Sequence, residues 1–184
     1  MTASLPRAPI MALAGAISGA LYALWLGFGT NSLGNLGRAG NVLDDLSHNA
    51  GAGIFYAVIV GAVLQAALKF EAWRWALWVV AAGISYAAAF QLAIQLYQPN
   101  QDWVVVNFLA GGAAGVVGAT LLCAASAALF PVLRDGRLVV MGAVAGGIVG
   151  LALPLALQAD AIPACIAFFA VWQSAYAVAS TRRA

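Results

Sequence analysis

The sequence has few charges and few of the side chains that hold metals. Charged residues make up 8% of its 184 residues, against about 25% in an ordinary soluble domain, and there are one histidine and two cysteines. A single histidine excludes a metal or haem site built from several histidines. The cysteines, Cys123 and Cys165, fall at opposite depths of different predicted helices, so no disulfide is expected. We expect no metal and no cofactor.

Catalytic and nucleic-acid signatures are also missing. The chain contains no GxSxG, HExxH or CxxC motif and no phosphate-binding loop between a strand and a helix. Ser47 stands beside His48, but adjacency alone does not make a catalytic triad. The net charge of +2 comes from cations that form neither a run nor a stripe, which argues against nucleic-acid binding. We therefore predict no catalytic residues.

Apolar residues are abundant instead, at 64% of the chain with a mean hydropathy of +0.95. About six apolar segments are long enough to cross the hydrocarbon core of a bilayer, which is roughly 30 Å thick and takes ~20 helical residues. They lie near residues 10–28, 50–68, 75–97, 104–128, 138–157 and 162–180. The sequence predicts an all-α fold: a polytopic membrane helical bundle that forms one transmembrane domain over residues 1–184.

The charges lie in the gaps between these segments, and their sign alternates from one gap to the next. Cations occur before the first segment, in every second gap and at the end of the chain: Arg7, Lys69, Arg74, Arg134, Arg137, Arg182 and Arg183. The intervening gaps are acidic or nearly free of cations: Asp44 and Asp45 with Arg38, then Asp102, then Asp160. By the positive-inside rule, both termini should be cytoplasmic, in a bacterial cytoplasmic membrane.

Small residues recur at helical spacing in several segments. The stripes are Ala12, Ala16 and Ala20; Gly111 and Gly115; and Gly142, Gly146 and Gly150. Such stripes let helix backbones approach closely in lipid. They predict a tight bundle, and they leave open contacts with other membrane subunits or with a second copy. Membrane lipids are the other expected partner.

Two irregular features interrupt the apolar pattern. Residues 29–46 are rich in Gly and Asn, and we expect a short interfacial helix near Val42–Ser47. Pro154 and Pro163 flank the last outer loop and should bend or end the helices there.

Uncommon polar residues gather on the predicted outer side. An acid and the sole histidine stand one helical turn apart before the second segment, two glutamines share a face of the third, and an acid and an asparagine begin the fourth. These candidate ligand-binding residues are Asp44, His48, Gln91, Gln95, Asp102 and Asn107. Polar groups inside a membrane mark a functional site by default.

Each candidate also has a structural interpretation. Asp44 and Asp102 can cap helix N-termini, and His48 can pair with Asp44 at the interface. The amides of Gln91, Gln95 and Asn107 can form a hydrogen-bonded layer between the third and fourth helices. The sequence does not decide between these roles and ligand binding.

The same region resembles the VanZ-like membrane proteins. The resemblance rests on Asp44-Asp45-Leu46-Ser47-His48, on Gln91 and Gln95, on Gln98-Pro99-Asn100-Gln101-Asp102, and on Asn107 before Gly111 and Gly115, within residues 44–118. Gln replaces an acid of the family pattern, and Gln101 replaces its arginine. The resemblance implies a cell-envelope factor of the kind linked to glycopeptide-antibiotic tolerance.

Three functions stay open. The first is an envelope factor that binds a small or lipid-linked ligand in an outward-facing polar pocket. The second is a small-solute transporter or its substrate-binding subunit, because the size resembles that of the binding subunits of energy-coupling-factor vitamin transporters. The third is a structural subunit of a larger membrane complex.

Overall fold

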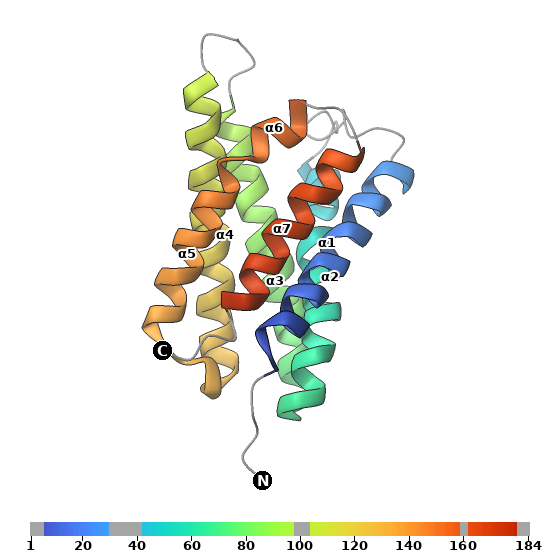
Figure 1. The fold of residues 1–184 in the computed structure, drawn as a ribbon, viewed down its shortest axis with the longest axis vertical. Coiled ribbons are helices and arrows are strands. Elements are labelled where there is room, and N and C mark those ends of the chain that lie inside the picture. The colour runs from blue at the N-terminus through green and yellow to red at the C-terminus, as the bar shows by residue number, and fades with distance from the viewer. Residues whose placement is uncertain (1–5, 30–41, 98–103, 159–161, 180–184) are drawn as a thin grey trace.

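The computed structural model describes the backbone of residues 6–29, 42–97, 104–158 and 162–179, and the side chains of 6–25, 49–97, 104–155 and 163–178. Within these ranges the chain is an all-α bundle without strands (Figure 1). Its elements are α1 (Ala8–Gly29), α2 (Val42–Leu68), α3 (Ala72–Leu96), α4 (Val104–Leu129), the short 3₁₀ helix η3 (Pro131–Leu133), α5 (Gly136–Gly150), α6 (Leu153–Gln158) and α7 (Ile162–Ala179). The predicted fold class is confirmed.

The long helices form a ring that α7 closes. Each of α1 to α4 packs against the next long helix in the chain and runs antiparallel to it, while the short α6 lies across one end of the bundle (Figure 1). Helix α7 then packs against α1 on one side and α5 on the other. The contact between α1 and α7 is the most extensive in the bundle, although more than 130 residues separate the two helices in sequence.

The exterior of the ring is apolar. Bulky side chains face outward around the bundle, including Ile84 at 62% exposure, Val105 at 70% and Ile148 at 65%. Within the described residues, five helical stretches are long and apolar enough to cross a membrane: Ala8–Trp25, Asn49–Leu68, Ala72–Leu96, Val104–Leu129 and Gly136–Leu155. The described part of α7, Pro163–Val178, is apolar but shorter. A surface of this kind suits lipid rather than water.

Two predicted boundaries differ from the observed ones. The expected short helix near Val42–Ser47 is not separate, because α2 runs without a break from Val42 to Leu68. The segment predicted at 138–157 is divided between α5 and α6 by a turn at Leu151 and Ala152. Pro154 explains the second break, since it has no N–H to bond to the carbonyl of Gly150.

Glycines at the helix crossings bring backbones into direct contact. A Cβ atom built on Gly15 or Gly19 of α1 would overlap the backbone carbonyls of Gln173 and Phe169 in α7. Gly53 of α2 meets the carbonyl of Ala82 in α3 in the same way. Without a hydrophobic drive between helices in lipid, this close packing supplies much of the association energy.

The α4–α5 crossing is built from two glycine pairs. Gly115 faces the backbone of Gly146, and Gly111 faces that of Gly150, with the two helices running antiparallel. The predicted glycine stripes of these segments therefore serve packing inside one chain.

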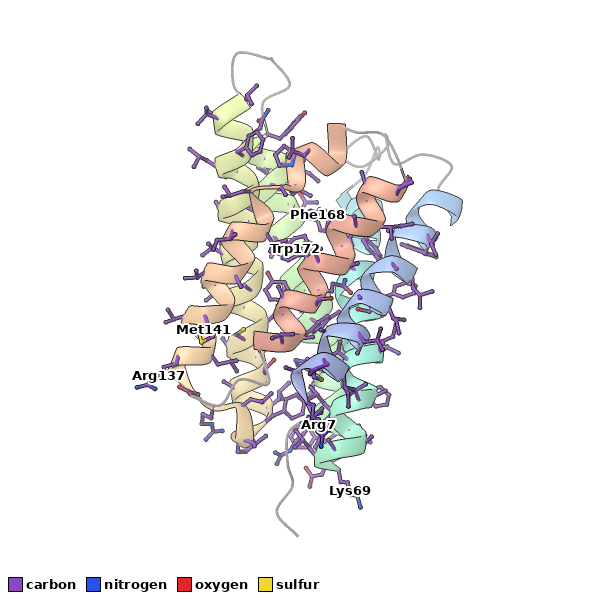
Figure 2. All side chains as sticks on the ribbon, viewed as in Figure 1. Arg7, Lys69, Arg137, Met141, Phe168 and Trp172 are labelled. Atoms are coloured by element: carbon purple, nitrogen blue, oxygen red, sulfur yellow. The ribbon has the colours of Figure 1, made fainter. Side chains whose placement is uncertain are left out.

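The described cations lie at one end of the bundle. Arg7, Lys69 and Arg137 occur together at the lower end in Figure 2, which is also the end where α1 begins and α7 finishes. This grouping is what the alternation of charge along the sequence requires of an antiparallel bundle.

The glycine crossing gives a stability prediction. Gly115→Ala should lower the free energy of unfolding by about 1–3 kcal/mol, because the new methyl group would press on the Gly146 carbonyl. Thermal unfolding in detergent measures the change.

Gly136→Ala is the matched control, because a Cβ atom at Gly136 would meet nothing within 4 Å. Its thermal midpoint should equal or slightly exceed that of the wild type, since alanine favours helix more than glycine does. An equal fall of the thermal midpoint in both variants would contradict the argument that the Gly115–Gly146 contact needs glycine.

Candidate functional site

Three of the predicted site residues lie partly or wholly outside the described residues. Asp44 and His48 belong to the first two turns of α2 rather than to a segment before it, and their side chains fall outside the described part of the chain. Asp102 falls outside it altogether. Their proposed role therefore stays a prediction.

The three predicted amides differ in exposure. Asn107 is buried in α4, Gln91 is half-buried on α3 and Gln95 is exposed. The amide layer between α3 and α4 stays a prediction too.

A polar centre that the sequence analysis did not single out lies where α7 meets α1 and α2. The Gln173 side chain is fully buried, and its Nε2 donates to the carbonyl of Ala52 in α2 at 3.0 Å. The Ser18 hydroxyl of α1 lies within hydrogen-bonding distance of Gln173 Oε1 and of the Gly15 carbonyl. One amide thus links three helices in the interior of the bundle.

Aromatic rings fill the space beside this polar centre. Tyr56 of α2, Tyr86 of α3 and Tyr176 of α7 are mutual neighbours, with ring centroids 6.1 to 6.4 Å apart. Trp172 and Phe168 project from α7 toward the interior (Figure 2), and the Trp172 ring lies 5.6 Å from that of Tyr86. The Tyr176 hydroxyl donates to the Gly115 carbonyl of α4 at 3.1 Å. Helix α7 therefore reaches across the bundle to α2, α3 and α4.

Several buried polar atoms in this interior lack a partner. Among the described residues, the Tyr86 hydroxyl and the Asn49 Oδ1 atom are buried without a hydrogen bond, and so is Gln65 Oε1 farther along α2. Tyr86 and Asn49 are each 2% exposed. Because a buried polar group without a partner costs about 1–3 kcal/mol, such atoms in a native protein call for a water or a ligand.

This arrangement can bind but offers little for catalysis. The described residues contain no group of three His, Cys, Asp or Glu side chains able to hold a metal. Among the described residues, the unpartnered groups of the interior are the Asn49 and Gln65 amide oxygens as acceptors, the Trp172 indole N–H as a donor and the Tyr86 phenol, which can donate or accept. These groups suit ordered water or a small ligand that combines polar groups with a surface able to pack against aromatic rings.

The sequence held a signal for part of this site. Ser18 is an isolated polar residue in an apolar segment, and Gln173 stands with Ser174 in another. Polar residues inside such segments are the pattern that marks intramembrane function. The tyrosines carried no such signal, because buried and interfacial tyrosines look alike in a sequence.

Comparison with known proteins found no matching family model, no similar curated protein and no similar solved structure. The site must therefore be interpreted from its own geometry.

The two central tyrosines should respond oppositely to loss of the hydroxyl. Tyr86→Phe removes a group without a partner and should leave the free energy of unfolding unchanged or raise it. Tyr176→Phe removes the bond to Gly115 and should lower it by about 0.5–1.5 kcal/mol. Thermal or denaturant unfolding of the two purified variants in the same detergent tests this difference; a larger loss for Tyr86→Phe would show that its hydroxyl is satisfied.

Proposed function

We propose that this chain is a multipass protein of the bacterial cytoplasmic membrane that binds a small or lipid-linked ligand through polar groups inside its bundle. The observation that carries the proposal is the buried Asn49 Oδ1, which has no hydrogen-bond partner among the described residues. Asn49 directly follows His48 and lies in the same half of α2 as Asp44. The acid, the imidazole and the orphaned amide therefore occupy two adjacent turns.

The geometry around Asn49 supports an internal site. Ala52, one turn further along α2, accepts the Gln173 amide, and Tyr56, another turn on, reaches the rings of Tyr86 and Tyr176. A ligand entering beside Asp44 and His48 would meet Asn49 first and the Gln173 amide next. Successive turns of α2 thus carry a polar group, a bonded carbonyl and an aromatic ring on the side that faces the bundle interior.

An outward-facing envelope factor is the form of this function that we favour. It agrees with the resemblance of residues 44–118 to the VanZ-like proteins and with the cation-poor end at which Asp44 and His48 are predicted to lie. The positive-inside rule would then place the end that holds Arg7, Lys69 and Arg137 in the cytoplasm.

A transport subunit is the second candidate. It would need a free small-residue face for coupling to a partner, and the stripe of Ala12, Ala16 and Ala20 on α1 would be that face. These residues are half-buried, and the Ala12 carbonyl accepts a hydrogen bond from Ser174 of α7. The Ala12 backbone is therefore bonded within the chain, while Ala16 lines a surface pocket. The envelope-factor proposal rests on the α2 site instead.

The ligand is best sought by native mass spectrometry of the protein purified in mild detergent. A bound small molecule or lipid should be present on the wild type and reduced about tenfold or more in Asn49→Leu and His48→Gln, since a lost polar contact in a desolvated site is worth ~1.4 kcal/mol or more. Asp44→Asn should act in the same direction.

Asp45→Asn is the control for this experiment, because Asp45 is offset by about 100° from Asp44 on the helix. Ligand occupancy should stay near the wild-type level in that variant. A wild type that carries nothing, or equal occupancy in all variants, would refute the proposed binding function.

The orientation is tested by cysteine labelling in intact cells. A cysteine at Asn35 or Gln101 should react with an impermeant thiol reagent, whereas one at Ala72 or Gly136 should react only after the cells are opened. The native Cys123 and Cys165 are buried, so they should contribute little background. Reversed labelling would overturn the proposed topology.

A further inference from the structure

A pocket of about 550 Å³ and a smaller one of about 340 Å³ open on the described surface. The larger is apolar and faces the lipid between α5 and α7, and nothing in the structure indicates a particular occupant. The smaller lies at the cation-rich end, between the α2–α3 connection and the end of α4, and its wall includes Lys69, Glu71 and Arg74. Its size falls in the range of about 300–1,000 Å³ that is typical of small-molecule sites.

Lys69 holds an unusual backbone conformation at the edge of this pocket. It ends α2 with φ of 50°, the only positive φ at a non-glycine residue in the described chain, and its N–H bonds to the Gln65 carbonyl at 2.9 Å. Helices that end in this left-handed conformation usually carry glycine there, because a side chain is strained. The strained lysine lines the pocket and has an exposed side chain. Strain of this kind is concentrated at functional positions.

Arg74 is held in the pocket wall by two hydrogen bonds, and one of its N–H groups stays available. Its Nε bonds to Glu71 Oε2 at 3.1 Å and its Nη1 bonds to the Leu129 carbonyl at 3.2 Å. Glu71 Oε2 also accepts the Trp73 indole N–H at 2.7 Å, so two donors share this oxygen. The Nη2 group of Arg74 has no partner among the described residues, and Lys69 forms no ion pair with any of them. The pocket therefore carries one uncompensated positive charge.

The pocket floor is rigid and aromatic. The Phe70 ring lies 4.5 Å from that of Phe130, which is buried and in turn contacts Trp78 at 5.7 Å. Beside the pocket, Trp73 is 55% exposed and begins a stripe of outward-facing apolar residues along α3 that continues through Leu77, Val80 and Ile84. A charged site at the end of an apolar stripe matches the layout of a phospholipid, with its phosphate at the helix ends and its chains along the bundle.

We propose that this pocket binds the headgroup of an anionic phospholipid, with Lys69 and Arg74 Nη2 donating to the phosphate and the acyl chains lying along Trp73, Leu77 and Val80. The net positive charge favours a lipid with a net negative headgroup over a zwitterionic one, in which a headgroup ammonium would face Lys69. Lys69 lies at the lower end of α2, with its side chain directed away from the helices (Figure 2). Basic pockets between helices at this face are where such headgroups bind.

The test is lipid binding by the purified full-length protein, measured by native mass spectrometry as phosphatidylglycerol or phosphatidylcholine is added. The wild type should bind phosphatidylglycerol about fivefold more tightly, the effect expected for one lysine near an anionic headgroup. Lys69→Gly should lose that preference. Its thermal midpoint without lipid should equal or exceed that of the wild type, because glycine relieves the strained φ. If Lys69→Gly proves unstable, Lys69→Asn provides the same test, since asparagine also tolerates this conformation.

Arg137→Gln is the matched control, because it removes one exposed cation from the same end of the bundle outside the pocket. It should keep the preference for phosphatidylglycerol. If Arg137→Gln and Lys69→Gly lost the preference for phosphatidylglycerol equally, the preference would come from the overall surface charge, and the proposal would be overturned. Displacement of the lipid by excess inorganic phosphate would also overturn it, because the pocket would then be a site for soluble anions.

Discussion

The crossing of α7 over Gly15 and Gly19 of α1 is the constraint on which the remaining architecture depends. It is the place where the last helix closes the ring, and only glycine allows the two backbones to come so close. The same approach brings Gln173 within reach of Ser18 and Ala52, so that one amide satisfies groups of two other helices. Larger side chains on α1 would push α7 outward and leave these polar groups facing lipid, where an unpaired polar group is costly.

Much of the fold could be predicted from hydropathy and charge. The apolar segments near 75–97 and 104–128 match α3 and α4 within a few residues, because a membrane helix must be long, apolar and bounded by polar residues. Pro154 correctly marked a bend, but the turn at Leu151 and Ala152 could not be placed from it alone. The helix that begins at Val42 was shortened in prediction, since its polar first turns resemble a separate interfacial segment.

The candidate site was less predictable, because it depends on which helices are neighbours. No local pattern shows that residue 173 lies beside residues 18 and 52. Hydropathy gives the depth of a residue but not the direction in which its side chain points, so Gln95 and Asn107 looked equivalent although one is exposed and the other buried. Tyr86 and Tyr176 are both buried, and they differ in hydrogen bonding instead. The Tyr176 hydroxyl has an acceptor and the Tyr86 hydroxyl has no partner among the described residues, which depends on neighbours that the sequence does not reveal.

The position of α7 also has a consequence for biogenesis. During synthesis the first five long helices enter the membrane before the segment that closes the ring has left the ribosome. Until then the Ser18 hydroxyl and the α1 glycines have no α7 to contact, and they must face lipid or be shielded by another protein. The native core is completed only when Gln173 of α7 reaches Ser18 and Ala52. A bundle without α7 would therefore expose the Ser18 hydroxyl and the α1 glycines that α7 covers in the complete fold.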